Sequence, residues 1–478
     1  MPRLLSPKLA ALTALVFILP APAVDAGSRL LDVPSAAATA TSAPIVTLGK
    51  SQMPQIEQRY QLTGSFSFSA SHIAIRETIT LVNHGTDFSF NTIDLSFIPR
   101  YLSSVGRAGY HNSFGQITVD GAAVASTWIR SASLLISLGK SIAPGQTVTI
   151  VVPFSEYVGG DTGVFGARLS KLRNILALGN WFPILSIDHP VGTMGDPFIT
   201  WNAVSIDVDL RLADAARSSL PVGAVVASGD PVSASGTHWV FHAVNVRDFA
   251  VTISPYYASC STKASNAVGT MIRARATASA SYSATANCSA MLAKASAAFA
   301  KYNSYFGQYA YKSFTVAESG GTSESMEYPT LIMMSYDKIR DGWTVYHETA
   351  HQWFYGMLGD DQLNEPWTDE AWASFAAFYF WNHSMRSACS SVNVNSGVAA
   401  FSAWSGCNQY LETVYYRGAR MIDSLRSAMG STAFFSAVRR YVNGYRYRLI
   451  SGYALLRYLD SQTTARLDHI YCPATSYC

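Results

Sequence analysis

Hydrophobic and polar residues alternate along much of the chain between residues 56 and 257. The alternation is clearest at Ile73, Ile75, Ile79 and Leu81. A period of two is typical of a β-strand that buries one face. Five further segments share the pattern: 93–97, 117–119, 134–138, 147–152 and 204–210. Residues 56–257 are therefore predicted to form an all-β domain, and no catalytic motif falls within it.

The periodicity changes in residues 258–478. After a stretch rich in Ser, Ala and Thr at 261–286, apolar residues recur at helical spacing from Met291 to Tyr302. Further elements are predicted as a strand at 312–317 and helices at 410–425 and 431–445. A chain of 478 residues is too long for a single core. The sequence thus predicts an α+β protein of more than one domain, in which the second domain is mostly helical.

One short motif in the second region is suited to metal binding. His347 and His351 flank Glu348 in an H-E-x-x-H pattern, so the histidines lie four residues apart. On an α-helix this spacing places both imidazoles on one face, where they can bind one metal ion beside the glutamate. A catalytic zinc ion takes three protein ligands and keeps one open position. The motif therefore predicts one Zn²⁺ per chain and requires a third ligand.

Glu370 is the predicted third ligand. Trp353 to Tyr355 can complete the first helix, and the Gly, Asp, Asn and Pro residues between 356 and 366 favour a turn. Trp367 then opens a second helical pattern that would direct Glu370 back toward the histidines. The alternative is that H-E-x-x-H is an accident of a buried aromatic helix. A correctly spaced second helix with a carboxylate argues against it.

Glutamate residues are concentrated in the same segment. The chain has ten, of which six lie from 318 to 370, and none lies between 156 and 318. A solvated acidic face would scatter these side chains, whereas a divalent cation offsets the repulsion among neighbouring carboxylates. The distribution therefore supports metal binding. The six are Glu318, Glu324, Glu327, Glu348, Glu365 and Glu370.

Three motifs together resemble those of the gluzincin peptidases of the aminopeptidase N type. The first is HETAHQWF, followed by Glu370 within WTDEAWASF. The segment from Ser325 to Pro329, SMEYP, resembles the family's G-x-M-E-N stretch, and Tyr415 to Gly418, YYRG, resembles its Y-x-K-G segment. The resemblance implies an N-terminal β saddle or sandwich domain at 56–257 and a thermolysin-like zinc peptidase domain at 258–478.

The resemblance also implies roles for individual residues. Met326 and Glu327 would bind the substrate, with Glu327 holding its free α-amino group. Tyr415 would donate a hydrogen bond to the tetrahedral intermediate. The strand at 312–317 would be the edge strand that places Glu327 beside the substrate. The expected partners are thus peptides with a free N-terminus.

Several positions depart from the family pattern. Ser325 replaces the first glycine, Tyr328 replaces the asparagine and Arg417 replaces the lysine. Residues 178–183, LGNWFP, stand where the family has a glutamine-containing stretch, so no second amine-binding residue is assigned. The chain ends about sixty residues after Tyr415, which fits a compact two-domain relative.

The ligand set predicts a mechanism and leaves three functional readings. Zinc lowers the pKa of a bound water toward ~7, and Glu348 would accept the proton of that water as it attacks the scissile carbonyl. The favoured function is a zinc aminopeptidase. The alternatives are a zinc endopeptidase or other zinc hydrolase on the same scaffold, and a catalytically silent surface or adhesion protein.

Three carboxylates near the motif are candidates for a supporting role. Asp361, Glu365 and Asp369 could each hydrogen-bond and orient a metal-binding histidine. A helix-capping or turn role is an equal alternative for each of them.

Composition and the N-terminus indicate export. Only 14% of residues are charged and the net charge is +3, which gives no reason to expect nucleic-acid binding. Residues 1–26 have a basic start, a short apolar core and small residues suited to cleavage, so they are predicted to be a signal peptide. Residues 27–55 are expected to be a flexible linker or pro-segment. No other segment is predicted to span a membrane.

The six cysteines fit an exported protein with disulfide bonds. Pairing between sequence neighbours is the simplest of the fifteen possible arrangements. It joins Cys260 to Cys288, Cys389 to Cys407, and Cys472 to Cys478.

Overall fold

The structure is a computed structural model that describes residues 45–129, 131–160, 168–186, 200–322, 324–362, 364–383, 411–475 and 477–478. All elements described below belong to one compact unit, Ile45–Cys478. The predicted signal peptide lies outside the described residues.

The described end of the predicted linker is packed against the β region. Backbone hydrogen bonds join Leu48 N to Thr92 O at 3.1 Å and Asn91 N to Val46 O at 2.9 Å. The 3-10 helix η1 (Met53–Gln55) follows and leads into the first strand. Val46 and Leu48 are thus joined to the neighbouring strand that contains Asn91 and Thr92.

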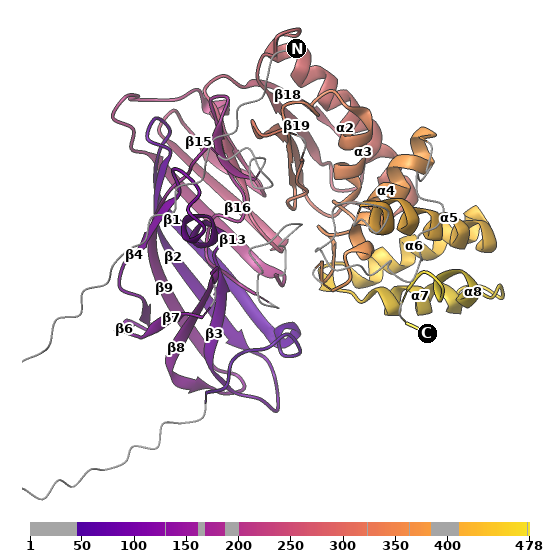
Figure 1. The fold of residues 1–478 in the computed structure, drawn as a ribbon, viewed down its shortest axis with the longest axis horizontal. Helices are drawn as coiled ribbons and strands as arrows, with labels where there is room; N and C mark the ends of the chain where they lie inside the picture. The colour runs from indigo at the N-terminus through magenta and orange to yellow at the C-terminus, as the bar shows by residue number, and fades with distance from the viewer. Residues whose placement is uncertain are drawn as a thin grey trace, which may run out of the picture. The chain divides into compact units, whose positions relative to one another are not determined.

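Within the described residues, the N-terminal region is built from β-sheets, as predicted (Figure 1). The largest has nine strands, antiparallel except for the pair β1 and β13. Ile73, Ile75, Ile79 and Leu81 all lie on its buried face. The strand order is β15 (Asp230–Ala234), β16 (His238–Val246), β13 (Ala203–Leu212), β1 (Ile56–Ser67), β2 (His72–Asn83), β9 (Thr147–Tyr157), β5 (Thr118–Val119) and β6 (Ala122–Ala123), and β4 (His111–Phe114) also pairs with β9.

Two smaller antiparallel sheets complete this region. One contains β10 (Leu169–Leu172), β11 (Ile175–Leu178), β17 (Val251–Ile253) and β14 (Val225–Ala227). The other contains β12 (Ile184–Leu185), β3 (Phe90–Ser96), β8 (Ser133–Ile142) and β7 (Ser126–Trp128). The short helices α1 (Ile98–Ser104) and η2 (Val222–Ala224) connect strands here.

A fourth sheet opens the C-terminal region and corrects one expectation. Its order is β18 (Ala258–Lys263), β19 (Met271–Ala276), β20 (Ser313–Glu318) and β21 (Leu331–Met334). The predicted strand at 312–317 is β20, but it pairs with strands on both sides and is not the edge strand. The edge strands are β18 and β21, and β21 lies next to β20 because the chain returns to this sheet after the Glu327 segment and adds a parallel strand there.

The remainder of the described chain is mostly helical, as predicted (Figure 1). The helices are α2 (Ala284–Tyr305), α3 (Gly342–Ala350), α4 (Trp367–Trp381), the π-helix η4 (Leu411–Arg417), α5 (Gly418–Met429), α6 (Ser431–Tyr445), α7 (Gly452–Ser461) and α8 (Asp468–Tyr471). The short pair β22 (Leu358–Gly359) and β23 (Arg448–Leu449) joins the loop after α3 to the loop after α6. The predicted boundary between residues 257 and 258 falls immediately before β18.

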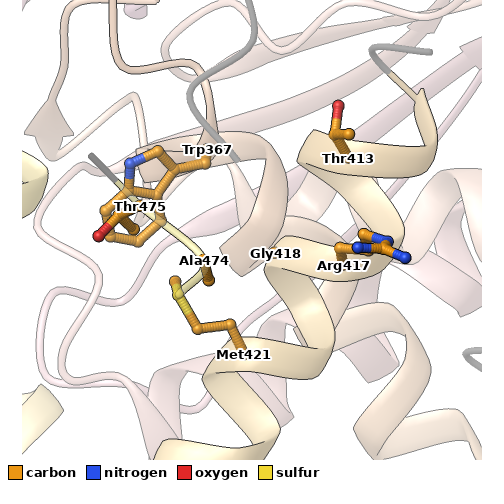
Figure 2. A pocket seen from close by; sticks show the side chains of 7 residues that line it. All are labelled: Trp367, Thr413, Arg417, Gly418, Met421, Ala474 and Thr475. Atoms are coloured by element: carbon orange, nitrogen blue, oxygen red, sulfur yellow. The ribbon is translucent and has the colours of Figure 1, made fainter. Parts of the chain in front are cut away.

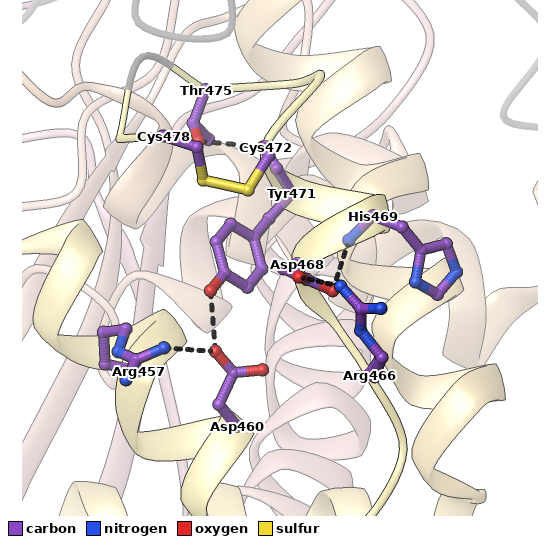
Figure 3. The surroundings of a disulfide bond; sticks show 9 residues. All are labelled: Arg457, Asp460, Arg466, Asp468, His469, Tyr471, Cys472, Thr475 and Cys478. Carbon is purple, nitrogen blue, oxygen red and sulfur yellow. Dashed lines mark hydrogen bonds and ion pairs between the residues drawn. A yellow bond between two sulfur atoms is a disulfide. The ribbon is translucent and has the colours of Figure 1, made fainter.

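Two of the three predicted disulfide bonds are present. Cys260 on β18 is bonded to Cys288 on α2, and Cys472 is bonded to Cys478. Figure 3 shows the second bond above Tyr471, whose hydroxyl donates to Asp460 Oδ2 at 2.6 Å. The predicted pair Cys389 and Cys407 lies outside the described residues. In the part of the chain that the structure describes, no helix has the length and apolar character needed to span a bilayer.

Candidate metal and active site

Helix α3 presents the first two motif residues. Asp341 caps its N-terminus by accepting hydrogen bonds from the backbone N–H groups of Trp343 and Thr344, both at 3.3 Å. These bonds satisfy donors that the first turn of a helix leaves unpaired, so the start of α3 is well defined. His347 and Glu348 are both buried, and the Trp343 ring stacks on His347 with centroids 4.9 Å apart.

The helix ends earlier than predicted. α3 stops at Ala350, whereas the sequence favoured a helix that continues to Tyr355. The backbone of Tyr355 has a φ of 119°, which a helix does not allow. His351 therefore forms the C-cap, and its Nδ1 donates a hydrogen bond to the carbonyl of Phe354 at 3.1 Å. This bond orients the ring and leaves Nε2 available as a metal ligand.

Glu370 completes a three-ligand arrangement from the first turn of α4. Its Oε2 lies 2.9 Å from His347 Nε2 and 3.4 Å from His351 Nε2, and the two Nε2 atoms are 3.1 Å apart. Neighbouring ligands of a tetrahedral zinc ion with bonds of ~2.0–2.1 Å are about 3.3 Å apart. The three atoms are buried together at nearly this spacing. The residues present therefore fit a zinc ion.

A second group of possible ligands shares His351. Glu327 and Asp369 each place a carboxylate oxygen within the same small radius of this histidine. The amide of Gln362, however, donates hydrogen bonds to both carboxylates, at 3.1 Å to Glu327 and 2.5 Å to Asp369. An N–H donor directed at both carboxylates opposes a cation beside them, so the group with His347 and Glu370 is the better metal site.

Mutual interactions set the charge of the ligands. Burial works to lower the pKa of His351, but the adjacent Glu370, together with Glu327 and Asp369, raises this pKa well above its usual value. Burial works to raise the pKa of Glu370, but His351 and His347 hold it below the usual range. Glu370 also lies in the first turn of α4, where the helix dipole favours negative charge. Glu370 is thus an ionised carboxylate, which is the form that binds a metal.

Glu348 has an environment suited to a proton acceptor. Its carboxyl group is buried, and burial together with nearby Glu327 raises its pKa well above the ordinary value for glutamate. Among the described residues no hydrogen bond to its carboxylate is found. A carboxylate whose lone pairs are available, and whose proton affinity is increased, can accept a proton from water.

Tyr415 lies beside His347. It belongs to the π-helix η4, and its ring stacks on His347 with centroids 5.4 Å apart and planes 6° from parallel. π-helical turns occur preferentially at functional sites. The contact places the tyrosine next to a predicted metal ligand.

Glu327 reaches the site from the segment before β21. Met326 and Met333 form two backbone hydrogen bonds, of 2.8 and 2.7 Å, which join this segment to the edge strand. Glu327 is buried, and burial raises the pKa of its carboxyl group although His351 opposes the shift. Met326 is buried as well and packs in a small apolar cluster with Tyr328 and Met333. The structure thus brings the Glu327 carboxylate close to His351, while Met326 supports the segment.

The three carboxylates predicted as supporting groups have different surroundings. Asp369 is buried next to Glu370 and accepts a hydrogen bond from its backbone N–H at 2.6 Å. Asp361 accepts from the Asn364 side chain and pairs with Lys50, and Glu365 accepts from Gly452 N at 3.1 Å. None of these bonds reaches a histidine. The turn or capping role considered for all three therefore fits Asp361 and Glu365.

Sequence reasoning missed the groups that contact the metal-binding motif from behind. Ser374 Oγ lies 3.4 Å from His347 Nδ1. Its position four residues after Glu370 on α4 puts both on one helix face, a signal that could have identified it. Gln352 donates to the carbonyl of Tyr328 at 3.1 Å, and Gln362 donates to Glu327. No periodicity marks either glutamine.

The segment at 178–183, which departs from the family pattern, contacts the Glu327 segment directly. Tyr328 donates a hydrogen bond to Asn180 Oδ1 at 2.7 Å, and Asn180 in turn donates to Asp248 at 3.1 Å. A Cβ at Gly179 would lie 1.9 Å from the Tyr328 hydroxyl, so only glycine allows this approach. Tyr328 thus occupies the space that the missing side chain of Gly179 leaves open.

One small pocket lies behind the site, and it is not a substrate pocket. Trp367, Thr413, Arg417 and Met421 are among the residues that line it (Figure 2). Its volume is about 10 Å³, which is room for about one water molecule. The pocket is a packing gap between α4 and the η4–α5 segment.

The fold is that of the two-domain M1 zinc metallopeptidases. A crystal structure of a variant of such an enzyme bound to L-tryptophan matches with a TM-score of 0.63 and 16% identity, over 90% of this chain and 98% of that one. The M1 zinc metallopeptidase from Deinococcus radiodurans matches with a TM-score of 0.61 and 15% identity, over 88% and 96% of the two chains.

A variant of the Deinococcus radiodurans enzyme bound to a Tyr-Ser-Ala substrate also matches, with a TM-score of 0.63 and 15% identity, over 90% of this chain and 98% of that one. No protein-family model matches the sequence. No curated protein matches it either. At these identities, the comparisons establish the fold, and the chemistry must be argued from the residues of this chain.

Proposed function

We propose that this protein is a zinc-dependent aminopeptidase that removes N-terminal residues from peptides. The observation that carries the proposal is the convergence of His347 Nε2, His351 Nε2 and Glu370 Oε2 at 2.9–3.4 Å from one another, with Glu348 next to His347 in the chain. The neighbouring Glu327 and Tyr415 provide a carboxylate and a hydroxyl on which amine binding and oxyanion stabilisation can depend.

Each residue has one role in the proposed reaction. His347, His351 and Glu370 would hold a zinc ion, which would supply Lewis acidity to polarise the scissile carbonyl and make water acidic near neutral pH. Glu348 accepts the proton of the attacking water and later delivers it to the leaving amine. Tyr415 donates a hydrogen bond to the oxygen that becomes negatively charged. Glu327 pairs with the substrate ammonium, which sets the cut one residue from the N-terminus.

Two further features complete the proposal. The disulfide bonds Cys260–Cys288 and Cys472–Cys478 support maturation in an oxidising compartment, in keeping with a cleaved signal peptide at 1–26. We place the catalytic domain at 258–478 and the β-domain at 56–257. The β-domain contributes Asn180, which contacts the residue that follows Glu327.

The proposal is tested by hydrolysis of a fluorogenic panel of aminoacyl amides, alongside an N-acetylated copy of each. We expect the metal-replete protein to cleave only the free amines. A chelator should abolish cleavage and added zinc should restore it, because the proposed reaction depends on the Lewis acidity of the metal ion.

The other outcomes assign the alternatives. Cleavage of the acetylated copies would make the protein a zinc endopeptidase, because such substrates have no ammonium for Glu327 to hold. No cleavage of either set with zinc bound would favour the catalytically silent scaffold. The segment 178–183 departs from the family pattern and leaves one amine-binding residue unassigned. Cleavage of the acetylated copies is therefore the more informative of the two outcomes.

A further inference from the structure

Gln362 links the predicted amine anchor to the metal-binding helix. It is buried in the loop that leads from β22 to α4. Its Nε2 donates to Glu327 Oε1 at 3.1 Å and to Asp369 Oδ2 at 2.5 Å. An amide nitrogen carries two hydrogens, so one donor serves each carboxylate.

Asp369 is itself fixed to the helix. Its other oxygen, Oδ1, accepts a hydrogen bond from the backbone N–H of Glu370 at 2.6 Å. Glu370 is the third predicted metal ligand, so the connection runs from the backbone of a ligand through Asp369 and Gln362 to Glu327. The position of the Glu327 carboxylate is therefore defined relative to the metal site.

A second contact holds the backbone of the same segment. Gln352 follows His351 directly, and its side-chain amide donates to the carbonyl of Tyr328 at 3.1 Å. Gln352 thus restrains the main chain next to Glu327, whereas Gln362 restrains the Glu327 carboxylate. Of these two glutamines, Gln362 is the one that contacts the Glu327 carboxylate itself.

We propose that Gln362 is a positioning residue that holds the Glu327 carboxylate in the orientation that binds the substrate ammonium, and so determines selectivity for a free N-terminus. The inference rests on the proposed function. A neutral amide is suited to this role, because it offers donors to two neighbouring carboxylates without adding a charge that would compete with the ammonium. Hydrogen bonds to charged groups are also among the stronger ones.

The test combines three variants in a double-mutant cycle. Gln362→Met keeps the length of the side chain and removes its donors, and Gln362→Glu keeps the shape and replaces donors with acceptors. Glu327→Gln removes the proposed anchor. Gln58→Met is the matched control, since Gln58 is a buried amide that donates to the carbonyls of Trp201 and Asn202 and accepts from the Tyr60 hydroxyl, away from the candidate site.

We expect Gln362→Met to raise KM for aminoacyl amides about tenfold with little change in kcat, and Gln362→Glu to raise it at least as much. Neither change should add to the effect of Glu327→Gln, because the glutamine acts through that carboxylate. Gln58→Met should leave KM unchanged. Additive effects of Gln362→Met and Glu327→Gln, or a KM unaffected by Gln362→Met, would overturn the proposal.

Binding provides a readout that does not require turnover. In the Glu348→Gln background, the affinity for an aminoacyl amide and for its N-acetyl copy is measured by calorimetry with zinc present. Gln362→Met should reduce the affinity for the free amine about tenfold and leave that for the acetylated copy unchanged. If the parent protein hydrolyses nothing, the proposed function fails, yet this amine preference and its loss would still support Gln362. Equal weakening for both ligands would overturn the inference.

Discussion

Buried glutamates occur in both regions of the molecule, and their surroundings differ. In the nine-stranded sheet, Glu77 on β2 and Glu156 on β9 are buried, and among the described residues neither carboxyl group has a hydrogen-bond partner. In the helical region, Glu370 is equally buried but contacts two histidines, and Glu327 accepts a hydrogen bond from Gln362. Burial raises the pKa of Glu77 and Glu156, whereas the histidines keep the pKa of Glu370 low.

The contrast shows that burial of an acidic group does not by itself make a site. A carboxyl group surrounded by apolar side chains avoids the cost of desolvation by remaining protonated. A carboxylate beside imidazoles, as Glu370 is, can stay ionised and bind a cation. The distinguishing feature of the candidate site is therefore the set of groups that face its carboxylates.

The largest effect is expected at Glu348. Glu348→Gln should reduce hydrolysis roughly 10³-fold, because the general base is lost, while the zinc ligands are unchanged. Activity and zinc content are measured on the same preparation. The matched change in the sheet, Glu77→Gln, should leave hydrolysis as it is. Wild-type activity in Glu348→Gln would remove this residue from the mechanism.

A smaller loss is expected at Tyr415. Tyr415→Phe keeps the ring that stacks on His347 and removes the hydroxyl, so we expect kcat to fall about 10²-fold at nearly constant KM. Steady-state kinetics on a free aminoacyl amide provide the measurement. An effect confined to KM would indicate that the hydroxyl binds the substrate as strongly in the ground state as in the transition state.

Ser374 should affect metal affinity more than chemistry. Its hydroxyl lies against the Nδ1 atom of His347, so Ser374→Ala removes a partner that orients a ligand. We expect zinc to bind about tenfold more weakly, as measured by competition with a fluorescent chelator. At saturating zinc, kcat should return to nearly the wild-type value. An unchanged affinity would show that packing alone orients this imidazole.

The smallest effect on activity, and a distinct one on stability, is expected at Glu77. Its pKa is raised in the folded protein above its unfolded value of ~4.3. The stability that its neutral form contributes is therefore fully present below that unfolded value and is lost as the pH rises toward the folded pKa.

Glu77→Met removes this titration. Relative to the variant, the free energy of unfolding of the wild type should decrease by up to about 1.4 kcal/mol per pH unit above about pH 5. Urea unfolding at several pH values tests the prediction, and hydrolysis should be the same in both proteins. Parallel pH profiles would show that Glu77 does not titrate on unfolding.

Much of the fold followed from local pattern. The alternation at Ile73, Ile75, Ile79 and Leu81 predicted β2, because side chains on a strand point to opposite faces in turn. The same alternation places residue 77 on the buried face, although it is a glutamate. The range 431–445 was predicted as a helix and is α6. Two of the neighbour disulfides are confirmed, since short loops bring their cysteines together.

The motif determined the kind of site as well. Four-residue spacing puts His347 and His351 on one side of the chain, and that geometry is local. The third ligand was predicted from a second helix, and the structure places Glu370 beside both histidines. Helix end points were less predictable. α3 ends at Ala350, a few residues before Tyr355 adopts a positive φ, and no glycine or proline in the sequence marks that end.

Only the tertiary structure decided which groups hold these residues in place. Gln362 meets Glu327 across 35 positions of sequence, and Asn180 meets Tyr328 across 148. Such contacts depend on how separate elements pack, and they leave no periodic trace in the sequence. The sequence therefore determined the elements and the metal-binding chemistry, through spacings within one helix or strand. The packing of the β-domain, the loop before α4 and the edge strand β21 determined the orientation of the proposed amine anchor.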